Sequence, residues 1–447
     1  MYVAEPPSYL DLEQEISGDR FTEILRQQAP LWQGSDREYL HWDRLRHLDP
    51  PGDLSHREWW YLLKFARRPM LRQIPLRDSE GRSFWYATPD EALRLLHLVD
   101  QRCSGEIAMP EVVTADEQAR QHYLVNSLME EAIRSSQLEG ATTSRRVAKD
   151  LLRSRRRPKD RSERMIVNHY DALQFMREHM GRKLTPAIVL ELHRILTEGT
   201  LDNPDAAGRL QRPDEDRVAV HDRADGKVIH RPPPAEQLPE RLETLCRFAN
   251  QTSDDKQFIH PVIRAVLLHF WMGYEHPFED GNGRTARTLF YWSMREQGYW
   301  LAEYLSISKI LRNAPAKYAR AFVLSETDEG DTTHFVLYQL HVIERAIKEL
   351  HTYLRRKVAE VRDVEQLIRG SARFNHRQLA LLGDAMRTPG QSYTFRSHAS
   401  SHNVTHETAR RDLGELQERG LFERRRMGRR HVFVPVADLS DRLQRAA

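Results

Sequence analysis

A short stretch near the middle of the chain carries side chains that suit phosphate chemistry. It runs His276-Pro-Phe-Glu-Asp-Gly-Asn-Gly-Arg-Thr-Ala-Arg287. His276 is a candidate base, because an unperturbed imidazole gains and loses its proton near physiological pH. Asp280 offers a hard carboxylate oxygen, the kind of ligand that Mg²⁺ prefers. We therefore predict a site in which His276 acts as a base and Asp280 holds a divalent cation.

The second half of this stretch is suited to binding an anion. Gly281 and Gly283 flank Asn282 and allow a positive φ and a close backbone approach, so that successive N–H groups can form an anion nest. A helix is expected to begin here, with the positive end of its dipole at the same place. Arg284 and Arg287 are three residues apart on its first turn, and both supply planar donors for phosphate oxygens.

Helices on both sides are expected to position the stretch. The apolar segment Val262–Tyr274 precedes it, and the helical pattern Thr285–Gln297 follows it. Leu184–Thr197 is also helical, with Thr185 as N-cap before a proline. In the segment Arg217–His230, two β-branched runs flank an Asp-Gly pair, which predicts a β-hairpin. Further helices are expected over Glu236–Ala249, Ser306–Ser325 and Thr333–Val361.

The first 110 residues are expected to form helices with short loops. Their tryptophans recur at helical spacing, around a Pro-Pro-Gly break, and favour a packed aromatic core over a ligand box. Ser55 is the expected N-cap of the second helix, and the aromatic run after Gly81 predicts a short strand.

Residues 375–447 have a different character. Three helices are expected, over Arg377–Met386, Ser397–Ser400 and Val404–Gly420, followed by two strands around a Met-Gly turn. This order predicts a winged helix-turn-helix module with Thr405–Glu418 as its recognition helix. Its basic residues make it a candidate DNA-binding surface: Arg410, Arg411, Arg424–Arg426, Arg429 and Arg430.

Bulk composition excludes several classes of protein. The 447 residues include 68 Lys and Arg against 65 Asp and Glu, a net charge of +3, so the chain as a whole is no polyanion binder. Two cysteines, Cys103 and Cys246, provide neither a disulfide framework nor a zinc ligand set, which suits a reducing cytosol. We see no signal-peptide pattern and no apolar run of about 18 residues, so we expect a cytoplasmic protein with no membrane partner.

The central stretch resembles the Fic (filamentation-induced-by-cAMP) family. It matches the family signature His-x-Phe-x-(Asp/Glu)-Gly-Asn-Gly-Arg-x-x-Arg at every defining position, and the resemblance extends from about Glu117 to Arg320. Upstream, Ser135-Ser-Gln-Leu-Glu139-Gly140 resembles the family's inhibitory motif, (Ser/Thr)-x-x-x-Glu-(Gly/Asn). Ser135 and Glu139 are four residues apart and share one helix face.

The resemblance implies a mainly α fold. We expect a Fic helical core with a small β-hairpin flap over residues 111–370, with the inhibitory helix near 123–140. An N-terminal helical region would cover residues 1–110, and the winged helix residues 375–447. The flap would pair with a target segment by strand addition.

The resemblance also implies a role for each loop residue. His276 would deprotonate a target hydroxyl, Phe278 would anchor the loop, and Asp280 would hold Mg²⁺ between the α- and β-phosphates of a nucleotide. Gly281, Asn282 and Gly283 would cradle the phosphates, with Arg284 on the β-phosphate. Arg287 would hold the γ-phosphate unless Glu139 pairs with it.

The implied function is an autoinhibited protein adenylyltransferase. It would transfer AMP from ATP to a Ser, Thr or Tyr hydroxyl of a protein. Removal of AMP at the same site, another nucleotide donor, and a DNA-binding regulator acting through the C-terminal module are alternatives. The sequence leaves open the target protein, the direction of the reaction and whether the chain forms a homodimer.

Overall fold

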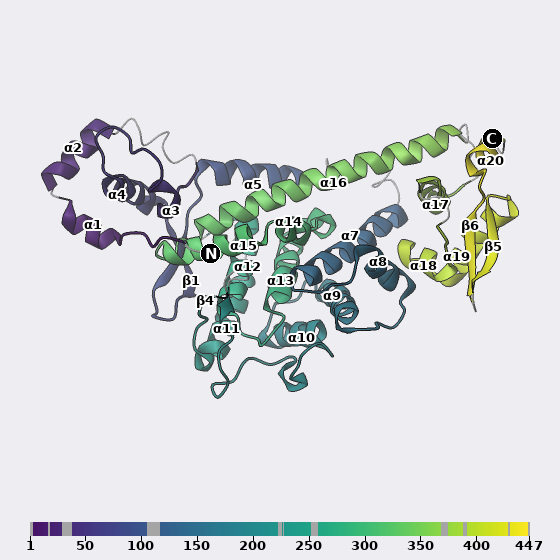
Figure 1. Cartoon of the computed structure of the whole chain (residues 1–447), viewed down its shortest axis with the longest axis horizontal. Helices are drawn as coiled ribbons and strands as arrows, with labels where there is room; N and C mark the ends of the chain where they lie inside the picture. The colour runs from purple at the N-terminus through teal and green to yellow at the C-terminus, as the bar shows by residue number, and fades with distance from the viewer. Residues whose placement is uncertain are drawn as a thin grey trace. The chain divides into compact units, whose positions relative to one another are not determined.

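The computed structural model describes residues 3–16, 18–28, 38–104, 117–221, 226, 228–251, 258–367, 374–387, 391–427 and 430–445. The chain divides into two compact units (Figure 1). The first comprises Met1–Ser104, Asp171–Ala302 and Ile307–Glu344, and the second comprises Gly105–Tyr170, Glu303–Ser306 and Arg345–Ala447. Two helices, α9 (Arg161–Glu178) and α16 (Thr333–Leu367), contribute residues to both units.

The core of the first unit is the helix pair α12 (Pro261–Glu275) and α13 (Asn282–Glu296), which pack along each other (Figure 1). Almost every side chain of α12 is buried, as expected for a helix that is apolar on all sides. α10 (Pro186–Thr197) packs on α13, and α11 (Leu238–Ala249) packs on α12. Thr185 caps α10 by accepting the N–H of Ile188, so the predicted cap is confirmed.

The N-terminal helices surround an aromatic cluster that includes Trp59, Trp60 and Tyr61. Ser55 caps α4 through a full capping box with Glu58. The helices around this cluster are α1 (Tyr9–Glu15), α2 (Gly18–Gln28), α3 (Trp42–Leu45) and α4 (His56–Arg67), and α5 (Asp90–Cys103) lies outside it. The predicted strand is β2 (Ser83–Tyr86), and it pairs antiparallel with β1 (Arg72–Arg77), which the sequence analysis missed. Short 3₁₀ turns occupy Arg68–Met70, Pro204–Ala206, Ala235–Gln237 and Trp300–Tyr304.

Proline and a short hairpin shape the segments on either side of the α12–α13 pair. The expected helix Ser306–Ser325 is wrong as a single element, because Pro315 starts a new helix and divides it into α14 (Ile307–Asn313) and α15 (Pro315–Thr327). The expected hairpin is confirmed as β3 (Val220–His221) paired antiparallel with β4 (Val228–His230). Most of its turn, residues 222–225 and 227, lies outside the described residues.

The second unit begins with α7 (Glu117–Leu138) and α8 (Arg145–Ser154), which pack with α9 through an apolar cluster that contains Met129, Ile133 and Leu152. The C-terminal part has the predicted order of three helices and a hairpin, with one more helix at the end. Its elements are α17 (His376–Arg387), α18 (Phe395–His402), α19 (His406–Glu418), β5 (Phe422–Met427), β6 (Arg430–Pro435) and α20 (Leu439–Arg445). The carbonyl and N–H of Tyr393 also pair with Phe433 of β6.

A buried carboxylate fastens the three C-terminal helices together. Asp412 of α19 accepts hydrogen bonds from Arg377 of α17 at 2.5 Å, from His398 of α18 at 3.0 Å and from Asn375 at 2.9 Å. Burial alone would raise the pKa of Asp412, but these donors outweigh it and hold that pKa well below its usual range.

Among the described residues, no helix combines the length and the apolar character needed to cross a membrane.

Candidate active site

The predicted site residues His276 to Arg287 lie in the turn between α12 and α13 and in the first turns of α13. His276 is the C-cap of α12 and has left-handed backbone angles, φ 44° and ψ 51°. Few residues other than glycine adopt such angles, so the surrounding contacts must hold them. The Nδ1 of His276 lies 3.4 Å from the carbonyl oxygen of Gly273. A carbonyl only accepts, which favours the proton on Nδ1 and leaves Nε2 able to take a proton.

A buried asparagine fastens the turn from within. The Oδ1 of Asn282 accepts the N–H of Phe278 at 2.9 Å, and its Nδ2 donates to the carbonyl of Phe278 at 2.7 Å. Both polar groups of this amide are therefore committed to the loop backbone. Any contact of Asn282 with phosphates would have to come from its backbone N–H, at the start of α13.

His193 of α10 contacts the turn and holds it in place. Nothing in the sequence pattern singled out this residue. Its ring stacks on the buried ring of Phe278, with centroids 3.7 Å apart and planes 5° apart. Its Nε2 donates to the carbonyl of Asp280 at 2.8 Å, and its Nδ1 accepts the N–H of Gly208 at 3.0 Å. These partners require a neutral ring. Burial lowers the pKa of His193 to about 4, with the charge of Arg284 acting in the same direction.

The two glycines of the signature have different conformations. Gly281 has φ 86°, and a Cβ there would lie 2.9 Å from the Cγ2 of Thr197, so both the backbone and the space demand glycine. Gly283 lies inside α13 and is absent from the positive-φ residues, so the expectation of a positive φ for Gly283 is wrong. The helix starts one residue earlier than Gly283, and helical angles follow.

Asp280 has an environment that fits a magnesium ligand. One carboxylate oxygen accepts the N–H of Gly281 at 2.6 Å, and the other lies 3.4 Å from Arg284. The Asp280 side chain is 41% exposed, whereas that of Arg284 is fully buried and also donates to the carbonyl of Leu196 at 2.9 Å. Mg²⁺ is commonly held by one carboxylate together with substrate phosphates and water, so a partly exposed carboxylate beside an anion site suits it.

Arg217 of the hairpin segment donates hydrogen bonds to carbonyls at the end of α12. The sequence pattern did not indicate this contact. Arg217 donates to the carbonyl of Glu275 at 2.8 Å and to that of His276 at 3.2 Å, and it also reaches Gln211. Gln211 in turn donates its N–H to the carbonyl of Pro277 at 2.9 Å. The last carbonyls of a helix have no partner within it, so these donors fix the position at which His276 leaves α12.

Arg287 lies further along α13 and is fully buried. Burial and the positive charge of Arg287 together lower the pKa of His269, on α12, to about 3. Neutral His269 shares a hydrogen bond with the hydroxyl of Tyr318 at 2.8 Å. His269 is therefore a core residue with a satisfied hydrogen bond.

The two residues of the predicted inhibitory motif belong to the second unit. Helix α7 ends at Leu138, so Glu139 follows its last turn, with its N–H bonded to the carbonyl of Ser135 at 3.3 Å. Ser135 is buried and Glu139 is half-buried. Gly140 has φ 102° and lies just beyond the end of the helix. Gln137 donates to the carbonyl of Thr143 at 2.8 Å and anchors the turn that follows.

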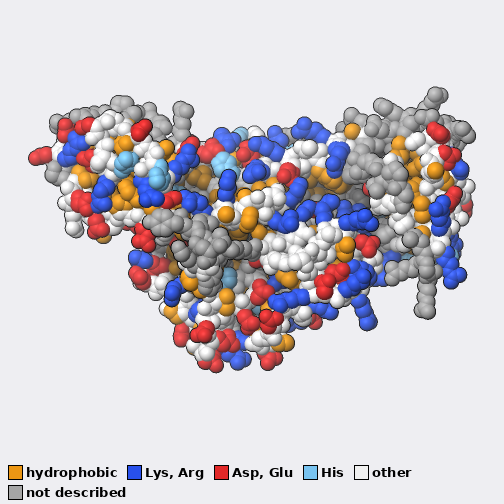
Figure 2. Space-filling model, in the orientation of Figure 1, with side chains coloured by type: hydrophobic (Ala, Val, Ile, Leu, Met, Phe, Trp, Pro, Cys, Tyr) orange, Lys and Arg blue, Asp and Glu red, His pale blue; other side chains and the backbone are white. Residues whose placement is uncertain are grey.

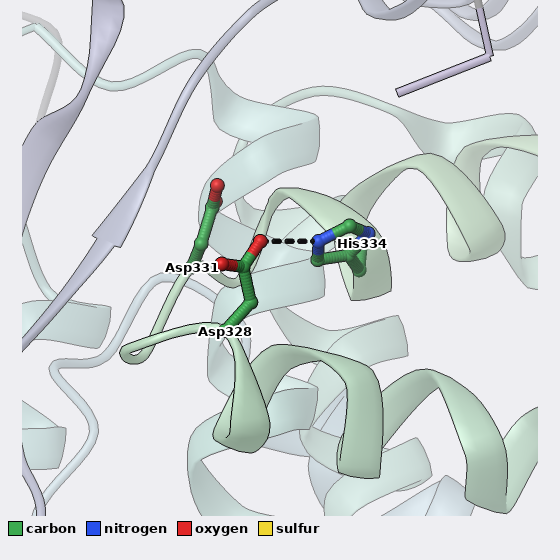
Figure 3. A group of neighbouring side chains, drawn as sticks. All are labelled: Asp328, Asp331 and His334. Carbon is green, nitrogen blue, oxygen red and sulfur yellow. Dashed lines mark hydrogen bonds and ion pairs between the residues drawn. The ribbon is translucent and has the colours of Figure 1, made fainter. Parts of the chain in front are cut away.

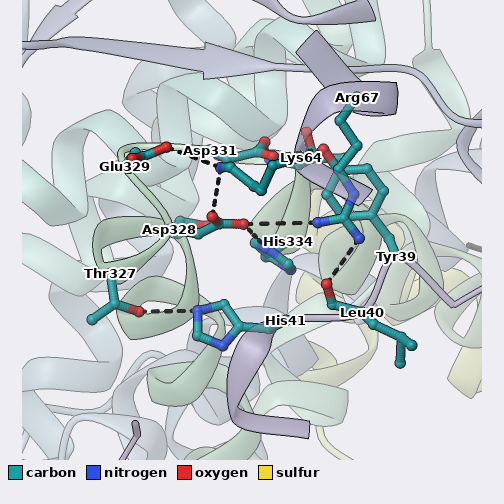
Figure 4. A network of polar contacts seen from close by, with 12 residues as sticks. Tyr39, Leu40, His41, Lys64, Arg67, Thr327, Asp328, Glu329, Asp331 and His334 are labelled. Carbon is teal, nitrogen blue, oxygen red and sulfur yellow. Dashed lines mark hydrogen bonds and ion pairs between the residues drawn. The ribbon is translucent and has the colours of Figure 1, made fainter. Parts of the chain in front are cut away.

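A second group of possible metal ligands lies in the first unit, in the turn between α15 and α16. Potential ligand atoms of Asp328, Asp331 and His334, the last on α16, lie within 4.8 Å of one another, and Asp328 and His334 face each other (Figure 3). Protein donors already bond to both carboxylates. Asp328 accepts hydrogen bonds from Lys64 at 2.7 Å and from His334 at 2.8 Å, and Asp331 accepts one from the hydroxyl of Tyr39 at 2.6 Å (Figure 4).

The ammonium group of Lys64 thus stands where a cation would be needed. Burial alone would raise the pKa of Asp328, but Lys64, His334 and Arg67 hold it well below its usual range. We interpret this cluster as a buried ionic network that joins α4 to the α15–α16 turn, and not as the predicted magnesium site.

Three comparisons with known proteins agree with this geometry. Residues 183–294 match the family model described as Fic/DOC family. A "Protein adenylyltransferase Fic" from Nematostella vectensis is 26% identical over 180 residues, which is 40% of this chain and 37% of that protein. The protein of the same name from Drosophila yakuba is 30% identical over 178 residues, 39% of this chain and 32% of that protein. The match thus spans about a third of the length of these relatives.

Among solved structures, a Fic family protein from Desulfovibrio desulfuricans has a similar fold. The alignment has a TM-score of 0.50 and 18% sequence identity, and it covers 78% of this chain and 97% of that one. The matched region of the family model begins just before α10 and ends in α13, so it contains His193, the hairpin and the whole signature turn. Residues 183–294 of this chain therefore form a Fic domain.

Proposed function

We propose that the protein is an adenylyltransferase that moves AMP from ATP to a hydroxyl side chain of a protein. The turn between α12 and α13 carries the proposal. It combines a histidine whose Nδ1 faces a carbonyl, a partly exposed aspartate and the start of a buried helix. The names of the curated relatives support the same chemistry.

In this mechanism His276 accepts the proton of the target hydroxyl at Nε2. The hydroxyl oxygen forms a bond to the α-phosphorus of ATP, the bond from that phosphorus to the bridging oxygen breaks, and pyrophosphate leaves. The backbone N–H groups at the start of α13 and the guanidinium of Arg284 receive the negative charge of the phosphates. Mg²⁺ held by Asp280 would neutralise part of that charge.

Replacement of His276 tests the role of the base. His276→Ala should abolish AMP transfer while ATP binding, measured by calorimetry, changes little, because the phosphate donors remain. His341→Ala is a matched control, since that histidine is exposed on α16 and pairs with acidic side chains. Transfer by His276→Ala at the wild-type rate would refute the assignment.

We further propose that the site is inhibited by Glu139. A carboxylate presented to the anion site would compete with a nucleotide phosphate for Arg287, and Ser135 would support the end of the inhibitory helix. Glu139→Gly should raise self-labelling by radiolabelled ATP well above wild type, and Glu139→Gln should raise it less, because the amide keeps the shape without the charge. If the self-labelling of Glu139→Gly stays at the wild-type level, the proposed inhibitory role of Glu139 is refuted.

The reverse direction is a second candidate. With Glu139 orienting a water molecule, the same turn could release AMP from a modified protein. The half-buried position of Glu139 just beyond α7 favours a carboxylate that is fixed in place, which either role requires. Incubation of the wild-type protein with the AMP-modified product of Glu139→Gly, followed by measurement of free AMP, separates the two directions.

The C-terminal part supports a third activity. The order of α17, α18, α19, β5 and β6, with Tyr393 paired to β6, supports the proposal of a winged helix-turn-helix. Arg410 and Arg411 on α19 and Arg424 on β5 are exposed. Arg429 lies outside the described residues. We propose that this module binds DNA, and a mobility shift measured over a range of salt concentrations tests it, because phosphate contacts make binding strongly salt-dependent.

A further inference from the structure

Helix α18 lies between the predicted recognition helix and the predicted inhibitory helix. It packs against α19 within the C-terminal module, and it also packs against both α7 and α8 (Figure 1). All four helices belong to the second unit. The guanidinium of Arg396, on α18, donates to the carbonyl of Arg155 at 2.8 Å, at the C-terminal end of α8. The module is thus attached directly to the α7–α8 pair.

Within that pair, α8 cannot move far without α7. Glu130 of α7 accepts hydrogen bonds from Arg145 of α8 at 2.8 Å and from Arg134 at 2.9 Å. Arg153 of α8 donates to Asn126 of α7 at 3.3 Å. Since Glu139 follows α7 directly, a shift of α8 relative to the module would be passed to the inhibitory glutamate.

On the other side of α18, the contact with α19 is tightly fixed. His398 of α18 and Arg377 of α17 both bond to the buried carboxylate of Asp412 on α19. A displacement of α19 is therefore transmitted to α18, and packed helices of this kind shift as rigid bodies.

The outer face of α19 has the features of a surface that meets a ligand closely. Gly414 lies near the middle of this helix, and a Cβ built on it meets nothing within 4 Å. Glycine weakens a helix relative to alanine, and no neighbouring atom of the described structure requires it here. Two exposed arginines, Arg410 and Arg411, lie one turn earlier. A missing side chain beside paired cations suits close approach of a helix to a polyanion.

The hairpin, whose strand β5 contacts α19, also carries positive charge. Strand alternation and the cross-strand pairs put Arg424 and Arg426 on the same side of the hairpin as Phe422 and Phe433, which pack in the core of the module. Figure 2 shows Lys and Arg side chains over the end of the molecule where β5 and β6 lie. Exposed Glu407 on α19 carries the opposite charge.

The junction between the module and α8 is itself crowded with positive charge. Lys149 and Arg153 of α8 both interact with Asp384 of α17. Burial, together with the charges of Arg153 and Arg145, lowers the pKa of Lys149 to about 8. The repulsion lies within α8, whereas Asp384 attracts Lys149 and Arg153 across the junction, so this charge holds the module to α8 together with Arg396.

We propose that duplex DNA bound on α19 and β5 is an effector that loosens the α18 contact with α7 and α8 and so releases the inhibitory helix. The proposal rests on the inhibitory role of Glu139 proposed above. It requires that DNA binds better to the loosened form than to the closed one, because a ligand shifts an equilibrium only by its difference in affinity.

Three measurements on the full chain test it, with a labelled DNA duplex of about 21 base pairs, two helical turns, as the probe. Fluorescence anisotropy gives binding, self-labelling by radiolabelled ATP gives activity, and hydrogen exchange of residues 130–141 gives the state of α7. We expect DNA to raise wild-type labelling by about fivefold or more, the lower range of allosteric coupling, and to speed this exchange. Arg396→Ala should raise labelling without DNA.

Gly414→Leu separates binding from folding. Leucine is a good helix former and meets open space, so the melting temperature should not fall, whereas DNA binding should weaken about tenfold or more because the side chain blocks close approach. Unchanged binding by Gly414→Leu, equal binding of duplex RNA, or DNA binding with unchanged exchange in residues 130–141 would each overturn the proposal. If Glu139→Gly is no more active than wild type, the proposed inhibitory role of Glu139 is wrong. The hydrogen exchange of residues 130–141 still tests, independently, whether DNA binding changes α7.

Discussion

His193 should support the catalytic turn in a pH-dependent way, and His193→Gln tests this. The amide of glutamine can reach the position of the imidazole Nε2 and keep the bond to the carbonyl of Asp280. It loses the acceptor for the N–H of Gly208 and the stacked ring against Phe278. An unsatisfied buried N–H costs about 1–3 kcal/mol, and the lost ring pair about 0.5–1.5 kcal/mol. We expect His193→Gln to lower the free energy of unfolding at pH 7 by about 2–4 kcal/mol.

The difference should shrink in acid. Burial lowers the pKa of His193 in the folded protein to about 4, whereas an unfolded histidine has its ordinary pKa of about 6.5. The stabilisation is complete above the unfolded pKa, and it is lost as the pH falls from 6.5 toward 4, because the unfolded chain binds the proton first. At pH 4.5 these two pKa values imply a loss of about 2.5 kcal/mol from the wild type, while glutamine does not titrate.

Urea unfolding followed by tryptophan fluorescence at pH 7 and pH 4.5 measures the difference. A ¹³C-labelled histidine spectrum checks the cause, since the His193 signal is the one missing in His193→Gln and should not titrate above pH 5. The reasoning is refuted if the wild type and His193→Gln lose stability in parallel between the two pH values. It is also refuted if the His193 signal titrates with a midpoint above 6.

Other substitutions test the remaining contacts. Arg217→Ala leaves the last carbonyls of α12 without donors, so a loss of about 1–3 kcal/mol in stability and a slower self-labelling rate are expected, with Arg217→Lys intermediate. Lys64→Met removes the closest cationic partner of buried Asp328, with Arg67 remaining at 3.9 Å, and should cost about 3–5 kcal/mol by urea unfolding, and adding Asp328→Asn should recover part of it. Asp412→Asn should likewise destabilise the C-terminal module and lower its melting temperature, with recovery on adding Arg377→Met.

The sequence predicted the elements that carry local signals. Thr185 and Ser55 cap helices as expected, because capping is a property of a few adjacent residues. Gly281 requires glycine for the expected reason, since the turn demands a positive φ. The β-hairpin and the C-terminal order of helices and strands were predictable for the same reason, because periodicity and turn residues are local.

What the sequence could not give are contacts between distant segments. His193 is about 90 residues from the signature by chain position and looks like one more histidine on an apolar helix; only the fold places it under Asp280. Arg217 was part of a predicted strand, and nothing local indicates that it reaches α12. A conspicuous signal was available for Pro315, whose position at the start of α15 could have divided the predicted helix.

These distant contacts bear on how the site can be controlled. Three side chains fix the turn through hydrogen bonds to its backbone. Asn282 bonds to Phe278, His193 to Asp280, and Arg217 to the end of α12. Such a site is preorganised, and deforming it would break several buried hydrogen bonds at about 1–3 kcal/mol each. Occupying its anion position requires one carboxylate and no change in the turn. Inhibition by a glutamate from outside the loop is therefore the least costly way to silence this geometry, and a helix such as α7, held by a separate module, is a suitable carrier for that glutamate.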